Sequence, residues 1–248
     1  MFFAKIGEYP PAGLFTPEHM ILLIITLSFI VFALAHSSEM SKDEVKKIIR
    51  ISTVTLAILE VVRIGFALTY TKPSDLNGYM PLYFCSLFLY AGIFSSFAKG
   101  FLKRVGDVFI ATGGILGGLV FLIFPSTSLS LFPAFHFMSI HSFIYHGVMV
   151  YLGILLNITG YVTLKKNDLV PYATLVGVLC FICLPLNRIF GSNLMFLSDA
   201  FPGKLGRIIF QALGRFYPLF VSLFHMFVPF YFIYYVREYK KKKHIRNI

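Results

Sequence analysis

The sequence predicts an all-α membrane protein, a polytopic bundle of seven transmembrane helices that forms one domain over residues 1–248. Three observations lead to this fold class. Hydrophobic residues make up 57% of the chain and charged residues 13%, against about 25% charged residues in soluble domains. Seven apolar runs approach or reach the roughly 20 residues that a spanning helix needs. Lysine and arginine gather in alternate connections between these runs. A chain of this composition cannot cover its surface in water, which excludes the soluble classes.

The predicted spans follow one another through short connections, and no internal repeat is visible. In chain order they are Pro17–Ala35, Ile51–Tyr70, Tyr79–Phe97, Val105–Phe124, Phe137–Leu156, Leu169–Ile189 and Phe216–Val236. The first span is interpreted as a retained anchor. A cleaved signal peptide has its positive charge before the apolar run, whereas most of the lysines near this run follow it.

The distribution of positive charge predicts the orientation of the bundle. Of the 22 lysines and arginines, 15 fall in the connections after the first, third and fifth spans and in the chain after the seventh. Positive residues stay on the cytoplasmic side, so the N-terminus is predicted outside and the C-terminus in the cytoplasm. We expect a multi-pass protein of the plasma membrane. Residues 237–248 form a basic tail, interpreted as an anchor near anionic lipid, and no nucleic-acid partner is predicted.

The second span carries two ionisable residues at mid-depth. Glu60 and Arg63 are three residues apart, so they share one face of a helix and are close enough to pair. An ionisable group inside the bilayer costs about 2.5–3.5 kcal/mol even on a low insertion scale, and such groups usually face the bundle interior. Two interpretations stay open: a buried ion pair that fixes helix packing, or the polar wall of a substrate cavity.

The three cysteines lie in apolar runs, which argues against a disulfide framework. Cys85 lies four residues after Pro81 in the third span, and it is either a small apolar filler or a nucleophile. Cys180 and Cys183 lie in the sixth span, where apolar surroundings should keep them protonated and inert. In the fourth span, the stretch ATGGILGGLV contains two overlapping Gly-x-x-x-Gly patterns, which are typical of a face for close helix packing.

The fifth span carries three histidines at intervals of five residues. His136, His141 and His146 are each rotated by about 140° from the one before, so they cannot converge on one metal ion. No metal and no other cofactor is predicted. His136 lies near the outer end and is interpreted as a solvated residue. His146, about 15 Å below it, and His225 in the seventh span are either hydrogen-bonded packing residues or functional groups.

The outer end of the sixth span gathers polar residues. Asn187, Arg188 and Asn193 lie within one short stretch there. A cationic mouth that carries amides could hold a phosphate headgroup through charge-assisted hydrogen bonds. The alternative is that these are ordinary residues of the membrane interface.

Cys85 and His146 are predicted to lie in the same outer half of the bundle. Cys85 is roughly 9 Å below the outer end of the third span, and the fifth span enters from the same side. A thiol in apolar surroundings needs a base to ionise, and imidazole is the usual one. If the two spans are neighbours, the spacing permits a nucleophile–base pair.

Four motifs carry a resemblance to a known family. The order FTPEH, PLYFC, HSFIYHGVMV and NRIFGSNLMFL resembles the YwaF family of bacterial membrane proteins, over nearly the whole chain. Its eukaryotic relative is transmembrane protein 164, and the androgen-induced membrane hydrolases are more distantly similar. The resemblance implies a phospholipid acyltransferase. Its cysteine nucleophile falls on Cys85, and its histidine falls on His146 or, as second choice, on His141. Tyr83 stands where the family commonly has histidine.

The resemblance and the residues together predict a membrane-embedded phospholipid or lysolipid acyltransferase, or a lipid esterase, that works through an acyl-thioester. Cys85 would be the nucleophile and His146 the base, and membrane phospholipids or lysolipids would be the partners. The residues expected to bind the substrate are Glu60, Arg63, His141, Asn187, Arg188, Asn193 and His225. The alternative is a transporter or ligand-binding membrane protein without catalysis, although the spans show no paired halves. The sequence does not distinguish a hydrolase from a transferase, because the two reactions differ only in whether water reaches the thioester.

Overall fold

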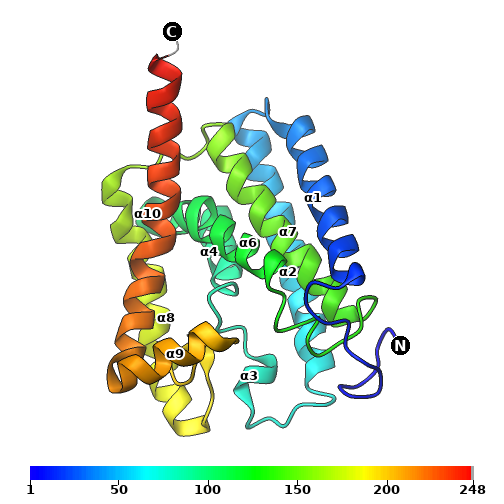
Figure 1. Cartoon of the computed structure of the whole chain (residues 1–248). Helices are drawn as coiled ribbons and strands as arrows, with labels where there is room; N and C mark the ends of the chain where they lie inside the picture. Colours follow the sequence, from blue (N-terminus) through cyan, green and yellow to red (C-terminus); the bar gives the residue numbers. More distant parts are fainter. Residues whose placement is uncertain (247–248) are drawn as a thin grey trace.

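The computed structural model describes residues 1–246, and this part of the chain is built from helices without a strand (Figure 1). Residues 247 and 248, the end of the predicted basic tail, lie outside the described residues. The α-helices are α1 (Pro17–Ser37), α2 (Lys42–Ala67), α3 (Leu76–Tyr79), α4 (Leu87–Phe97), α5 (Gly100–Phe109), α6 (Ile115–Ile123), α7 (Phe137–Ile158), α8 (Leu169–Phe190), α9 (Lys204–Leu213) and α10 (Tyr217–Arg246). Short helical turns are η1 (Ile110–Gly114), η2 (Lys166–Asp168), η3 (Leu194–Phe196) and η4 (Gly214–Phe216).

The predicted all-helical membrane fold is confirmed, but the predicted count of seven spans is not. Five stretches are long and apolar enough to cross a membrane: Pro17–Ser37, Gly100–Ile123, Phe137–Ile158, Lys166–Phe190 and Lys204–Lys243. The predicted second span corresponds to α2, which has 26 residues but carries Arg50, Glu60 and Arg63 along its length. The predicted third span contains only α4, whose 11 residues are too few to cross alone.

The third predicted span, Tyr79–Phe97, is a regular helix only in its second half. α4 begins at Leu87, and Met80 has an extended backbone with φ −70° and ψ 127°. Pro81 explains the difference, because its ring disfavours the helical conformation at the preceding residue and it has no N–H to donate. The chain therefore enters the bundle through irregular backbone, and Cys85 lies in the turn that precedes α4.

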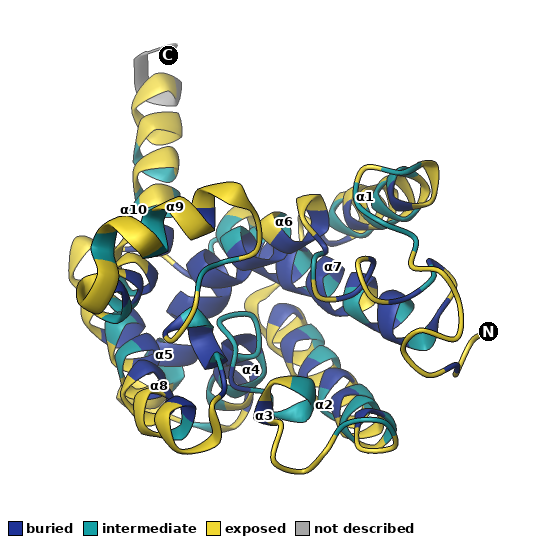
Figure 2. Ribbon diagram, turned by 60° about the horizontal axis from the view of Figure 1, so that its bottom comes forward, coloured by how far each residue is buried: buried dark blue, intermediate teal, exposed yellow. Residues whose placement is uncertain are grey.

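The centre of the bundle is formed by α7 and by the long helix made of α5, η1 and α6. α6 packs on α7, α4 packs on both α2 and α5, and α8 packs on α5 and α10. α1 rests on α7 and is mostly exposed, so lipid must cover its outer face (Figure 2). The turn before α4 is thus held beside the most buried helices.

Glycines bring the central helices close together, as the overlapping Gly-x-x-x-Gly patterns predict. A Cβ atom at Gly118 would lie 2.6 Å from Cγ2 of Val150 and 2.9 Å from the carbonyl oxygen of His146, both on α7. A Cβ atom at Gly106 would lie 2.3 Å from the carbonyl oxygen of Ala91 on α4. Neither contact leaves room for a side chain, so these glycines set the spacing of α6 from α7 and of α5 from α4.

The long central helix is interrupted by η1, a π-helical turn that accommodates one residue more than an α-turn. Nδ2 of Asn157 on α7 donates to the carbonyl oxygen of Ala111 in this turn at 2.8 Å. Arg237 on α10 donates in turn to Oδ1 of Asn157 at 3.1 Å. The π-helical turn is therefore tied to two neighbouring helices.

One end of the bundle collects the connections that the sequence predicts to be cytoplasmic. Figure 1 shows the connection after α1, the connection after α7 and the C-terminal end of α10 together, with the N-terminus, α3 and α9 at the opposite end. Near the first end, Asp107 accepts from Oγ of Ser95 at 2.6 Å and pairs with Nζ of Lys103 at 2.5 Å. Arg104 pairs with Asp168 across the α5–α8 contact. Which end faces the cytoplasm stays a prediction.

Candidate functional site

Cys85 is the most exposed of the three cysteines. The residue is half-buried and packs against the core, whereas Cys180 and Cys183 are buried on α8. Sγ of Cys85 donates to the carbonyl oxygen of Gly117 on α6 at 3.8 Å, and Sγ of Cys183 donates to the carbonyl oxygen of Leu82 at 3.7 Å. The exposure separates Cys85 from the two cysteines that the sequence predicts to be inert.

Glu60 and Arg63 form the ion pair that their spacing on α2 predicts. Nε and Nη2 of Arg63 each donate to the Glu60 carboxylate at 2.9 Å, a bidentate contact. Nη2 of Arg63 also donates to the carbonyl oxygen of Tyr79 at 2.8 Å. The pair therefore holds the chain just before the irregular segment that carries Cys85.

His141 on α7 completes a polar cluster with this ion pair. Its Nε2 atom lies 3.6 Å from Oε2 of Glu60, too far for a hydrogen bond but within ion-pair distance. Among the described side chains, neither ring nitrogen of His141 has a hydrogen-bond partner, although the residue is only 6% exposed. A buried imidazole with both nitrogens unused, beside a carboxylate, is available to a polar group of a ligand.

Tyr145 connects the polar cluster to the turn of Cys85. It lies one helical turn after His141, and the two rings stack with centroids 6.0 Å apart. Its hydroxyl donates to the carbonyl oxygen of Cys85 at 3.4 Å. Tyr145 is absent from the residues that the sequence predicts for the site. Its spacing of four residues from His141, which places both side chains on one face of α7, is the signal in the sequence that points to it.

His146 faces a different neighbour from the one that the sequence predicts. Its ring stacks on Phe121 of α6 with centroids 3.6 Å apart, and its Nδ1 bonds the carbonyl oxygen of Ser142 at 2.7 Å. Because a carbonyl oxygen only accepts, Nδ1 must carry the proton, which leaves Nε2 free to act as a base. Among the described side chains, no hydrogen bond joins the sulfur of Cys85 to an imidazole, so the predicted pair is not formed in this conformation.

The prediction that His136 is solvated is wrong. His136 is fully buried: Nε2 donates to the carbonyl oxygen of Ala4 at 2.9 Å, and Nδ1 accepts from the backbone N–H of Met138, which caps α7. His19 on α1 likewise uses both nitrogens, on Phe15 and Leu122. Both residues are structural. The burial of His136 is explained by the N-terminal segment, which folds back over the start of α7, where Phe2 bonds the N–H of Phe137 and Ala4 bonds His136.

His225 on α10 lies on the other side of the Cys85 turn. Its ring stacks on Phe84, the residue before Cys85, with centroids 4.9 Å apart, and it is 7% exposed. Its Nδ1 atom has no partner among the described side chains. Of the three histidines, His225 contacts the turn of Cys85 directly, and His141 is connected to it through Tyr145. His146 contacts Phe121 and Ser142 instead.

The three predicted headgroup residues after α8 have different surroundings. Asn187 is buried, and its amide bonds the Ser192 hydroxyl and both backbone polar groups of Leu194. The side chain of Asn193 bonds backbone groups of Ser198 and Asp199. Both amides are thus committed to the loop after α8, whereas Arg188 is exposed.

Replacing Asn187 with alanine should destabilise the protein by about 2–4 kcal/mol, because three hydrogen bonds are lost and the N–H of Leu194 becomes unpaired inside the protein. Asn167→Ala on exposed η2 is the matched control and should leave the melting temperature in detergent unchanged. Equal melting temperatures for the two variants would contradict a structural role of the Asn187 amide.

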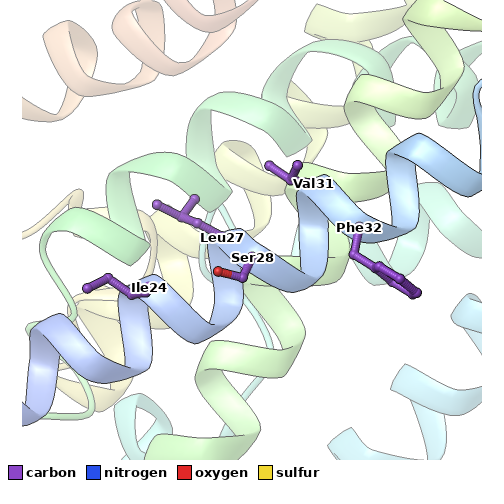
Figure 3. Close-up of a pocket in the computed structure, with 5 residues that line it drawn as sticks. All are labelled: Ile24, Leu27, Ser28, Val31 and Phe32. Carbon is purple, nitrogen blue, oxygen red and sulfur yellow. The ribbon is translucent and has the colours of Figure 1, made fainter.

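The described part of the chain has a hollow on the surface of α1 and another near the start of the chain and the end of α8. One, of about 500 Å³, follows the outer face of α1 and is lined by Ile24, Leu27, Ser28, Val31 and Phe32 (Figure 3). The other, of about 530 Å³, is lined by Ile6, Tyr70, Thr71, Lys72, Ser74, Asp75, Phe190 and Gly191. The first is almost entirely apolar. The second is more polar, and none of the predicted headgroup residues Asn187, Arg188 and Asn193 lines it.

The helical fold, its apolar surface and its buried polar cluster define a multi-pass membrane protein. The chain belongs to the TMEM164 family, whose model matches residues 14–235. No curated protein and no solved structure matches it. The resemblance to transmembrane protein 164 is thereby confirmed, whereas the YwaF name and the similarity to androgen-induced hydrolases stay predictions.

Proposed function

We propose that this protein transfers acyl chains between membrane lipids through a thioester on Cys85. One observation carries the proposal: the most exposed cysteine of a membrane protein lies in a turn that Tyr145 ties to the Glu60–His141 cluster. A half-buried cysteine in a membrane can meet an acyl ester directly. Two lipid substrates can lie along the bundle, so no soluble carrier is needed.

His146 is the proposed base for the first half of the reaction. The Ser142 carbonyl fixes its tautomer and leaves Nε2 without a proton. In the proposed reaction, the Cys85 thiol leaves the carbonyl of Gly117 and gives its proton to this nitrogen. The thiolate attacks the ester carbonyl, and the C–O bond breaks. The lysolipid alkoxide leaves and takes the proton from His146. A lysolipid hydroxyl then gives its proton to His146 and attacks the thioester. The C–S bond breaks, and the proton passes from His146 to the thiolate of Cys85.

The polar cluster and an exposed arginine support substrate binding. His141, Glu60 and Arg63 are proposed to contact the polar part of the ester, while His225 flanks the turn of Cys85. Arg188 is proposed to contact the headgroup phosphate, because it is an exposed cation at the end of α8. Asn187 and Asn193 would act indirectly by holding the loop that follows.

We further propose a topology of seven crossings in the plasma membrane. α2 and the segment from Tyr79 to Phe97 supply the two crossings beyond the five long apolar stretches. The connections after α1 and after α7, which carry or border lysines, share one end of the bundle in Figure 1 with the C-terminal end of α10. This placement supports a cytoplasmic assignment for that end and an external N-terminus.

The nucleophile is tested with a chloroacetamide that carries a lipid tail, on purified protein in phospholipid nanodiscs. Label should be incorporated into the wild type and lost in Cys85→Ser. Cys180→Ser is the matched control and should label normally, because Cys180 is only 3% exposed. Equal labelling of Cys85→Ser and the wild type would overturn the proposal.

The base is tested with a phospholipid that carries a radiolabelled acyl chain. We expect a hydroxylamine-sensitive acyl-protein in the wild type and about 10²–10⁴-fold slower formation in His146→Ala. If His141→Ala shows this loss and His146→Ala does not, the base is His141. Transfer of label to added lysolipid supports a transferase, whereas release as free fatty acid would replace it with an esterase.

A further inference from the structure

Helix α9 has a polar stripe that faces away from the bundle. Lys204, Arg207 and Gln211 are spaced by three and four residues, so their side chains lie on one side of the helix, and all three are exposed. Arg207 lies 3.6 Å from Asp199, but both side chains are more than half exposed. An exposed pair of this kind contributes at most about 1 kcal/mol, so the guanidinium is free to exchange partners.

Beside this stripe, α9 exposes an apolar one. Leu205 and Ile208 are 71% and 60% exposed, and Ala212 continues the same side of the helix. Exposing large aliphatic side chains to water is unfavourable. An apolar stripe that runs beside a polar, positively charged stripe is typical of a helix that lies in a membrane interface. The two stripes point to an environment that is apolar on one side and aqueous on the other.

The third side of α9 is fixed to the bundle. A Cβ atom at Gly206 would lie 2.2 Å from the carbonyl oxygen of Phe201, so the helix rests directly on that backbone. The ring of Phe210 packs on Tyr217 at the start of α10, with centroids 4.9 Å apart. With this side held, the helix cannot rotate to hide Leu205 and Ile208.

The exposed apolar stripe continues surfaces that the membrane must cover. Ile189 near the end of α8 and Leu219 at the start of α10 are 72% and 59% exposed. Figure 1 shows α9 lying across the ends of α8 and α10 rather than along them, and Figure 2 shows its outer side exposed. Arg215 follows α9 and is also exposed, so positive charge borders the apolar surface.

We propose that α9 lies in the membrane interface at the end of the bundle that holds the N-terminus, with the acyl region of the bilayer and the phosphates of phospholipids as its partner. Leu205 and Ile208 insert among the upper parts of the acyl chains, while Lys204 and Arg207 contact the phosphates. This surface is independent of Cys85 and goes beyond the proposed acyl transfer.

The depth of α9 is tested by spin labelling of the full chain after Cys85, Cys180 and Cys183 are replaced by alanine. Single cysteines replace Leu205, Ile208 and Gln211, and the protein is placed in nanodiscs of phosphatidylcholine and phosphatidylglycerol. Labels at 205 and 208 should collide more with oxygen than with a water-soluble nickel complex, and the label at 211 should do the opposite. The references are Phe181→Cys, 77% exposed on α8, and Asn167→Cys on η2. Labels at 205 and 208 that behave like the one at 167 would overturn the proposal.

The phosphate contacts are tested in the Leu205→Cys protein by adding K204E and R207E together. Charge reversal should move the label at 205 toward water, because repulsion from the phosphates lifts the helix. The matched control adds K165E and K166E, which lie between α7 and α8, and should leave the label unchanged. An unchanged label depth in the K204E/R207E protein would show that the phosphates are not the partner.

Discussion

Replacing Gly106 with alanine should prevent the bundle from forming. The new Cβ atom would lie 2.3 Å from the carbonyl oxygen of Ala91 and 2.5 Å from the backbone nitrogen of Ser95. Both are backbone atoms of α4, so no side chain can move aside, and α4 must separate from α5. Separation would also break the hydrogen bond from Ser95 on α4 to Asp107 on α5, and it would expose the ion pair of Asp107 with Lys103. Alanine favours a helix by about 1 kcal/mol over glycine, which is small against this clash.

The matched control is Gly65→Ala on α2, where a Cβ atom would meet nothing within 4 Å. This variant should melt at or slightly above the wild-type temperature. Gly106→Ala should give no monodisperse peak in size-exclusion chromatography after detergent extraction. A Gly106→Ala protein with the elution and melting temperature of the wild type would show that α4 and α5 are not packed so closely.

Replacing Arg63 with methionine should destabilise the protein by about 3–5 kcal/mol, because it leaves the carboxylate of Glu60 buried without its bidentate partner. The carbonyl oxygen of Tyr79 loses its donor at the same time. The second variant, Glu60→Met with Arg63→Met, removes both charges and should recover most of this loss, since an apolar pair of similar volume requires no desolvation.

Reversible unfolding in mixed micelles measures both variants and Glu60→Met alone, so the pair's coupling energy follows from a double-mutant cycle. Lys103→Met provides a comparison. Because Lys103 is more exposed than Arg63, this substitution should lower the free energy of unfolding by less than Arg63→Met does. Additive losses in the cycle would mean that Glu60 and Arg63 do not interact and would remove the basis for the polar cluster.

Sequence patterns predict the helices of this bundle well where the apolar runs are uninterrupted. Pro17–Ala35 and Phe137–Leu156 match α1 and α7 to within two residues at each end. The third span fails because hydropathy does not depend on backbone conformation, whereas Pro81 changes the conformation without making the run less apolar. That failure falls on the turn that carries Cys85.

The candidate site could be predicted only in part. The spacing of residues along one helix is sufficient to predict the ion pair of Glu60 with Arg63. The apolar sequence around Cys183 is sufficient to predict that it is buried. The spacing of residues along one helix does not report contacts between helices. The sequence therefore does not predict the contact of Tyr145 with the Cys85 turn or the burial of His136. The partner of His136 is Ala4, more than 130 residues away along the chain, and no local pattern reports such a contact.

The π-helical turn at Ile110–Gly114 has a consequence for chain length. Its one additional residue rotates α6 by about 100° relative to an uninterrupted continuation of α5. Shortening the turn by a single residue would restore ordinary helical geometry and keep the span apolar. It would also carry Gly117 around the helix axis and present a different carbonyl to the Cys85 sulfur. The carbonyl oxygen that α6 presents to the Cys85 sulfur therefore depends on one inserted residue. Inserting or removing this residue would hardly change the hydropathy of the span.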